Sequence, residues 1–239
     1  MSEHTVKAFD KELQSLGTKI AEMGGLAEKM LTDSIDALIR LDGDLARSII
    51  ESDLKLDTLQ REVEEESVNI IARRQPVGVD LREVIGALRI SGDLERVGDL
   101  AKNIAKRALA IGNDQQMPRA MVGLRHMGKM AALQLKDVLD AFSQRDVERA
   151  RNVWIRDAEI DAFEDSIFRD LLTFMMEDPR NISVCTHLLF CSKNVERVGD
   201  HATNVAETVH YVVTGQTLPV ERPRAVAGAD RKSTRLNSS

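Results

Sequence analysis

The sequence predicts an all-α protein made of two tandem bundles of three long helices. Aromatic residues account for only 3% of the 239 residues and there are 5 prolines, a composition that favours helices over sheets. Apolar residues recur at three- and four-residue intervals along most of the chain, as they do in amphipathic helices. A twelve-residue stretch occurs twice, at 94–105 and 195–206, which indicates an internal duplication.

The first half of the chain contains three expected helices. Apolar spacing predicts the first helix over residues 3–42. The turn Asp42-Gly43-Asp44 offers an N-cap for a second helix, which ends near Arg74. Asp80 can cap a third helix, which passes through the first copy of the repeated stretch and ends near Ile111.

The second half repeats this order. A fourth helix is expected from Pro118 to about Ser143, and a fifth follows a turn near Asp146 and continues to about Met176. A sixth helix, after a break at 178–181, carries the second copy of the repeated stretch. The predicted domains are a first three-helix repeat at 1–114, a second at 115–216, and a disordered tail at 217–239, where Pro, Gly, Ser and charged residues lack periodicity.

Charge and hydropathy narrow the function classes. The formal net charge of -6 argues against a dedicated nucleic-acid binder, which would carry a basic face. No apolar stretch is long enough for a transmembrane helix or resembles a signal peptide, so we expect a cytoplasmic protein. Cys185 and Cys191 point to different faces of one expected helix, so we expect two reduced packing residues rather than a disulfide or a zinc site.

The repeated stretch carries a pattern of paired carboxylates. Each copy holds a Glu and an Asp four residues apart, which on a helix lie about 5 to 6 Å from each other on one face. The second and fifth expected helices carry acidic pairs of the same spacing. Counting residues from chain reversals near 78 and 180, at about 1.5 Å per residue, places the two pairs of each half at one height.

Four carboxylates at one height repel each other unless they are exposed, protonated or bridged by cations, and oxygen ligands suit hard cations. The sequence therefore predicts one metal site in each half. The expected ligands are Asp53, Asp57, Glu95 and Asp99 in the first half and Asp157, Asp161, Glu196 and Asp200 in the second.

Other interpretations remain open at this point. The acidic residues could form ordinary solvated faces, paired with Arg96, Arg197, Lys55 and Arg156. Gly98 and Gly199 fit a tight site or close helix packing equally well. His201 could serve only one site as a ligand, because Leu100 occupies its position in the first copy.

No motif in the sequence argues for an enzyme. A Gly-rich phosphate loop, a nucleophile elbow and a Cys/His pair at catalytic spacing are all missing, as is the Glu-x-x-His spacing of di-iron sites. Asn103 and Asn204 lie one turn beyond the acidic pairs, where each could supply a carbonyl ligand or orient a carboxylate.

Four segments together resemble the PhoU family of phosphate-specific transport system accessory proteins. They read SVNIIARRQPVGVDLREV, GDLERVGDLAKNIA, LTFMMEDPRNI and NVERVGDHATNVAETVHYVVTG, and the resemblance extends over about residues 5–216. It implies two tandem PhoU repeats in a cytoplasmic, usually dimeric protein. It also implies that the eight carboxylates named above hold multinuclear clusters of a metal such as Fe, Zn, Mn or Mg.

The resemblance further implies a non-enzymatic regulator of phosphate uptake and signalling. Such a protein damps the phosphate-starvation response together with a sensor histidine kinase and the ATPase of the phosphate ABC importer, and reaches the membrane only through these partners. The alternatives are a metal-dependent enzyme or a metal store that uses the carboxylate clusters, and a helical scaffold without metal.

Overall fold

A computed structural model of the chain describes residues 3–112 and 120–219, and this part is helical with no strand. The predicted all-α fold class is confirmed. The helices are α1 (Glu3–Arg40), α2 (Gly43–Arg74), α3 (Val79–Ile111), α4 (Ala120–Gln144), α5 (Val147–Glu177) and α6 (Ile182–Thr214), with a short 3-10 helix η1 (Pro179–Asn181) before α6. The expected domain boundary near residue 114 and most of the expected disordered tail lie outside the described residues.

Local sequence explains where α2, α3 and α5 begin. Asp42 caps α2, where its side chain accepts hydrogen bonds from the backbone N–H groups of Asp44 and Leu45. Asp146 caps α5 in the same way through the N–H of Arg149. The expected capping role of Asp80 is wrong: α3 begins after Gly78, whose φ of 62° suits a residue without Cβ, and Asp80 lies inside the first turn.

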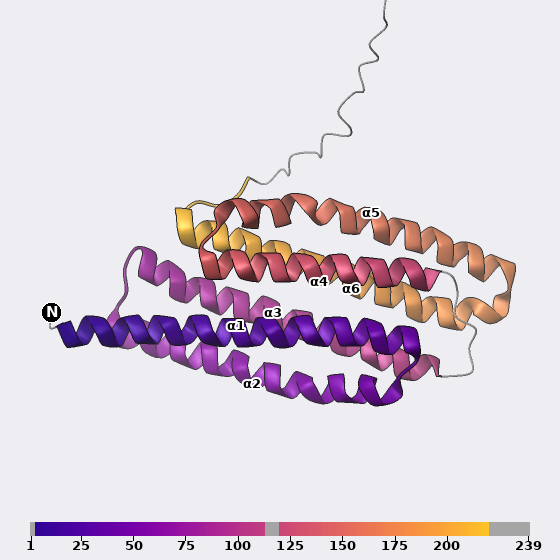
Figure 1. Cartoon of the computed structure of the whole chain (residues 1–239), viewed down its shortest axis with the longest axis horizontal. Helices are drawn as coiled ribbons and strands as arrows, with labels where there is room; N and C mark the ends of the chain where they lie inside the picture. Colours follow the sequence, from indigo (N-terminus) through magenta and orange to yellow (C-terminus); the bar gives the residue numbers. More distant parts are fainter. Residues whose placement is uncertain (1–2, 113–119, 220–239) are drawn as a thin grey trace, which may run out of the picture.

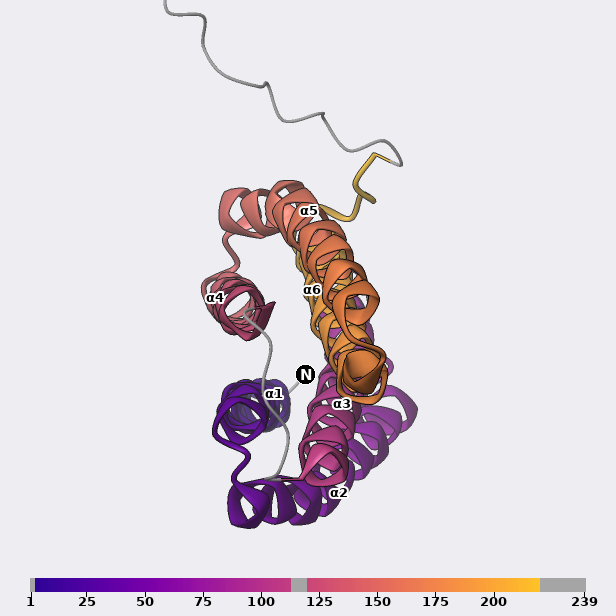
Figure 2. The ribbon, with the colours of Figure 1, turned by 90° about the vertical axis from the view of Figure 1, so that its right-hand side faces the viewer.

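The six helices lie side by side along the long axis of the molecule (Figure 1). Seen end-on, α2, α3, α6 and α5 form a curved row, and α1 and α4 lie against one side of it (Figure 2). We call α1–α3 the first repeat and α4–α6 the second repeat. Each repeat is a three-helix bundle, and the two bundles meet through α3 against α6 and α1 against α4.

One hydrophobic core passes through both repeats. It contains fully buried residues of α1 such as Met23 and Leu31, and continues through α3 and α6 into α4 and α5. Cys185 and Cys191 are both buried and free, as predicted. Burial also raises the pKa of the Cys191 thiol to about 12, which keeps this thiol protonated and unreactive at neutral pH.

Within residues 3–112 and 120–219, no helix combines the length and the apolar character needed to cross a lipid bilayer.

Candidate functional site

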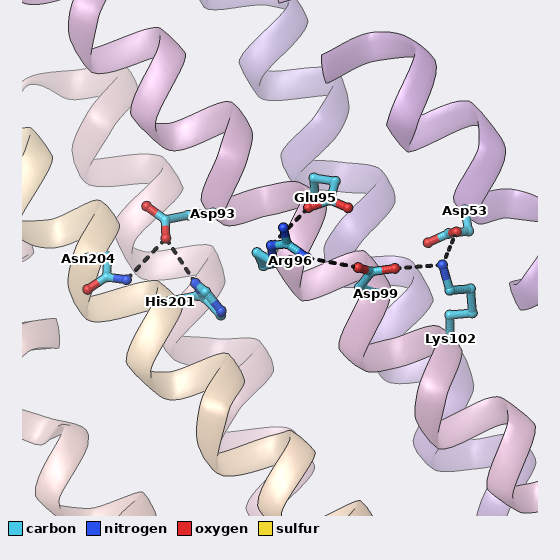
Figure 3. Close-up of polar contacts among 8 residues, drawn as sticks. All are labelled: Asp53, Asp93, Glu95, Arg96, Asp99, Lys102, His201 and Asn204. Atoms are coloured by element: carbon cyan, nitrogen blue, oxygen red, sulfur yellow. Dashed lines mark hydrogen bonds and ion pairs between the residues drawn. The ribbon is translucent and has the colours of Figure 1, made fainter. Parts of the chain in front are cut away.

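The predicted carboxylates of the first repeat come together between α2 and α3. We call Asp53, Asp57, Glu95 and Asp99 the first cluster. Asp53 is 5% exposed, and the other three are partly buried. Lys102, one turn after Asp99, reaches into this cluster, where its Nζ donates hydrogen bonds to Asp53 and, at 2.6 Å, to Asp99 Oδ1 (Figure 3). The acidic side chains are thus joined by a cation from the chain itself.

The charges of the first cluster influence one another. Burial raises the pKa of Glu95, and the nearby carboxylates of Asp99 and Asp57 raise it further. Burial also opposes ionisation of Asp99, but the hydrogen bond and charge of Lys102 outweigh it, and the pKa of Asp99 lies below its ordinary value. Burial likewise opposes the charge of Lys102, but its bonds to Asp53 and Asp99 raise the pKa of its amine. The amine is therefore charged at neutral pH.

The predicted carboxylates of the second repeat lie on α5 and α6. We call Asp157, Asp161, Glu196 and Asp200 the second cluster. Asp157 is 1% exposed, Glu196 is partly buried, and Asp161 and Asp200 are exposed. Lys193 donates a hydrogen bond to Glu196 Oε1 at 2.7 Å. That bond, with the charges of Glu196, Glu164 and Asp200, raises the pKa of Lys193.

Gly98 and Gly199 occupy the same position in the two copies of the repeated stretch, and we call them the motif glycines. They allow close approach of α2 to α3 and of α5 to α6. A Cβ on Gly98 would lie 2.2 Å from Leu56 Cδ2, so the first repeat uses this glycine for apolar packing. A Cβ on Gly199 would lie 2.7 Å from Asp157 Oδ1. Ile160 Cδ1 lies 3.2 Å from the same position, so the second repeat uses the equivalent glycine to admit a buried carboxylate as well as an apolar side chain.

The third helix around each glycine also differs between the repeats. Met30 Cε lies 3.7 Å from the Cβ position of Gly98, whereas Gln134 Oε1 lies 3.7 Å from that of Gly199. Gln134 is 1% exposed, and its Oε1 has no hydrogen-bond partner among the described residues. Oε2 of Glu196 is likewise buried without a hydrogen-bond partner in this part of the chain. Such oxygens are costly to bury unless a donor or a cation reaches them.

A separate polar contact joins the two repeats beside the clusters. Asp93 Oδ1 on α3 lies 2.9 Å from His201 Nδ1 and accepts a hydrogen bond from Asn204 Nδ2 at 3.1 Å (Figure 3). Asp93 directly precedes the first copy of the repeated stretch, and His201 lies within the second, so both copies lie where α3 and α6 meet. His201 and Asn204 thus contact a carboxylate of the other repeat.

The chemistry available at both clusters is cation binding by oxygen. Within the described residues, no three His, Cys, Asp or Glu side chains already converge on a metal position. Binding at the second cluster would therefore require its carboxylates to move closer to a common point. The buried acceptors Gln134 Oε1 and Glu196 Oε2 suit a hard cation there. At the first cluster, Lys102 would have to leave its two carboxylates.

Sequence reasoning missed Lys102 and Gln134. Both positions were visible as differences between the halves: Lys102 corresponds to Thr203 in the repeated stretch, and Gln134 corresponds to Met30. These differences could have been read from the sequence, but the prediction relied on acidic residues shared by the two halves and did not consider positions where the halves differ.

Comparison with known proteins supports the duplication and the fold. The family model described as PhoU domain matches residues 20–108 and 124–209. A phosphate-specific transport system accessory protein PhoU homolog of Rhizobium meliloti (strain 1021) is 52% identical over 92% of this chain and 93% of its own length. A homolog of the same name from Caulobacter vibrioides (strain NA1000 / CB15N) is 50% identical over 94% of this chain and 97% of its own.

Two solved structures of PhoU proteins have the same fold as this chain. PhoU from Pseudomonas aeruginosa is 39% identical in sequence to this chain. Its crystal structure superimposes with a TM-score of 0.84, and the match covers 87% of this chain and 100% of that chain. The phosphate transport system regulatory protein PhoU from Streptococcus pneumoniae is 28% identical, with a TM-score of 0.82 over 89% of this chain and 100% of that one. The chain, with its two matched domains and its two copies of the acidic motif, belongs to the PhoU family.

Proposed function

We propose that this chain is a non-enzymatic regulator of phosphate uptake and signalling, which restrains the phosphate-starvation response when phosphate is abundant. The observation that carries this proposal is the 52% identity, over nearly the whole of both chains, to a relative named as an accessory protein of the phosphate-specific transport system. The similar structure from Streptococcus pneumoniae is itself named a regulatory protein.

The proposed regulator works through protein contacts. In this proposal a cytoplasmic homodimer engages the ATPase of the phosphate ABC importer and the sensor histidine kinase, and reaches the membrane only through them. The resemblance to the family supports these partners. Long packed helices that share one core suit such an adaptor, because they present extended rigid faces.

We further propose that the two clusters bind multivalent metal ions such as Fe, Zn, Mn or Mg. The support is chemical: each cluster offers four carboxylates on two facing helices, and the second adds buried acceptor oxygens. A bound ion would supply the positive charge that holds these carboxylates together. The side chains themselves would link α2 to α3 and α5 to α6, and so stiffen each bundle.

A strain that lacks this gene tests the regulatory function. We expect alkaline phosphatase activity to stay high in phosphate-rich medium in the deletion strain, and to return to its low level when the full-length gene is supplied on a plasmid. Normal repression of alkaline phosphatase in the deletion strain would contradict the proposal.

Elemental analysis of the purified protein tests the metal proposal. We expect metal in the wild-type chain and strongly reduced metal in the quadruple variant Glu95→Gln, Asp99→Asn, Glu196→Gln and Asp200→Asn. Glu51→Gln, which changes an exposed carboxylate of α2, serves as a matched control and should retain the metal. Equal metal content in all three proteins would overturn the ligand assignment.

A further inference from the structure

The first cluster holds a cation that belongs to the chain. Lys102 is 20% exposed, and its amine lies between two carboxylates from different helices, Asp53 of α2 and Asp99 of α3 (Figure 3). An ammonium group in this place does what a bound metal ion would do, because it neutralises the carboxylates and links the two helices. The amine and a metal ion therefore compete for the same oxygens.

The second cluster has a different residue at this position. Thr203 replaces Lys102, and its hydroxyl donates to the backbone carbonyl of Asp200 at 2.7 Å. A hydroxyl carries no charge. Lys193, which pairs with Glu196, lies at the edge of the cluster with its side chain 56% exposed. An exposed lysine is well hydrated and contributes little to neutralising carboxylates that are more deeply buried.

A second, independent difference between the repeats is the side chain that α1 or α4 places near the motif glycine. Gln134 directs a buried Oε1, which has no hydrogen-bond partner within residues 3–112 and 120–219, toward Gly199 beside Asp157. Met30 presents a methyl group to Gly98. A carbonyl oxygen can bind a hard cation or complete its surroundings, but a methyl group cannot. Both differences favour an external cation in the second repeat and disfavour one in the first.

We propose that Lys102 is a built-in counter-cation of the first cluster, so that a metal ion enters this cluster only by displacing the lysine amine. The second cluster, which lacks this lysine and contains Gln134, binds metal at a lower concentration. The inference rests on the metal-binding part of the proposed function. It makes the two repeats unequal: the second is loaded with metal first, and the first responds only to higher metal concentrations.

The test measures Mn²⁺ binding to each cluster separately in the full-length protein after treatment with EDTA. Glu196→Gln with Asp200→Asn disables the second cluster, and calorimetric titration then reports on the first. In this background, Lys102→Thr should tighten Mn²⁺ binding by at least about tenfold, because ion entry no longer breaks two charged hydrogen bonds. Lys106→Thr, an equal charge change at an exposed position of α3, should leave the affinity unchanged.

The reciprocal change tests the same idea in the second repeat. With the first cluster disabled by Glu95→Gln and Asp99→Asn, Thr203→Lys should weaken Mn²⁺ binding by at least about tenfold, since a lysine would then compete for the second cluster. Circular dichroism establishes that each variant is folded. If Lys102→Thr does not fold, the reciprocal variant alone decides the question.

The outcomes separate the two proposals. Absence of Mn²⁺ binding by the wild-type protein would overturn the proposed metal function and this inference with it. Mn²⁺ binding that is abolished by the cluster variants but unaffected by the lysine exchanges would overturn the inference alone. A first cluster that binds Mn²⁺ as tightly as the second in the wild-type protein would also contradict it.

Discussion

The two carboxylate clusters share their acidic residues but differ in their surroundings. In the first repeat, Lys102 bridges two of the carboxylates, and Leu56 and Met30 surround the motif glycine. In the second repeat, Ile160 lies beside the glycine, and so do a buried carboxylate and a buried amide oxygen. Duplication has thus kept the four acidic positions while the residues that determine their charge balance have diverged. Equal motifs in one chain need not bind the same ion equally well.

The largest change in the free energy of unfolding is expected from exchanging Met30 and Gln134, the residues near the motif glycines. Met30→Gln would bury an amide in an apolar position, and we expect it to lower the free energy of unfolding by about 3 kcal/mol. Gln134→Met would remove a buried oxygen that has no hydrogen-bond partner in the described part of the chain, so it should stabilise the metal-free protein by about 1 kcal/mol. Urea unfolding of both variants in EDTA buffer measures these changes.

A matched control for this exchange is Leu133→Gln, because Leu133 is 48% exposed on the same helix as Gln134. Its unfolding free energy should change by less than about 0.5 kcal/mol. If Met30→Gln and Leu133→Gln behave alike, the two surroundings do not differ in the way described.

The next effect concerns the internal ion pair of the first repeat. Asp53→Asn keeps the shape of a buried side chain but removes one of the two charges that hold Lys102, and we expect a loss of about 2 kcal/mol in EDTA buffer. Thermal or urea unfolding measures it. Asp57→Asn should cost less than about 1 kcal/mol, because Asp57 is more exposed. A larger loss for Asp57→Asn than for Asp53→Asn would show that Lys102 does not hold the cluster together.

The sequence was sufficient to predict the helices but not the charge balance of the clusters. Helix limits follow from local chemistry such as the Asp42 cap, and apolar periodicity defines the buried faces. The prediction for Asp80 was wrong because Gly78, with its positive φ, already begins the turn into α3. The contact of Lys102 with Asp53 joins two helices, and only their relative rotation in the fold determines which carboxylate the lysine reaches.

The motif glycines provide a third, smaller contrast. Gly98→Ala forces Leu56 to move, and we expect a net loss of about 1 kcal/mol after the gain in helix propensity, with metal binding by the second cluster unchanged. Gly199→Ala displaces the carboxylate of Asp157 and should reduce the metal content of the second cluster. Urea unfolding and elemental analysis of both variants measure these effects. Equal loss of metal in the two variants would mean that both glycines act only through packing.

The smallest change in stability is expected at the C-terminal ends of α2 and α5, where the two repeats also differ. Arg74, at the end of α2, donates two hydrogen bonds of 2.8 Å to Glu12 on α1, whereas Asp178, after α5, bonds Arg180 two residues away. Hydrogen bonding from Arg74 lowers the pKa of Glu12 below its ordinary value of 4.5 despite partial burial. The contact between α1 and α2 is therefore sensitive to acid.

Because the folded-state pKa of Glu12 is the lower one, its stabilisation is fully present above about pH 4.5 and is lost as the pH falls through the folded-state value. Glu12→Gln should remove this part of the acid dependence and cost less than about 1 kcal/mol at pH 7. Thermal unfolding of wild type and variant between about pH 3 and pH 7 measures it, and the two curves should converge at the acidic end. Parallel curves throughout would show that Arg74 and Glu12 do not join α1 to α2 in solution.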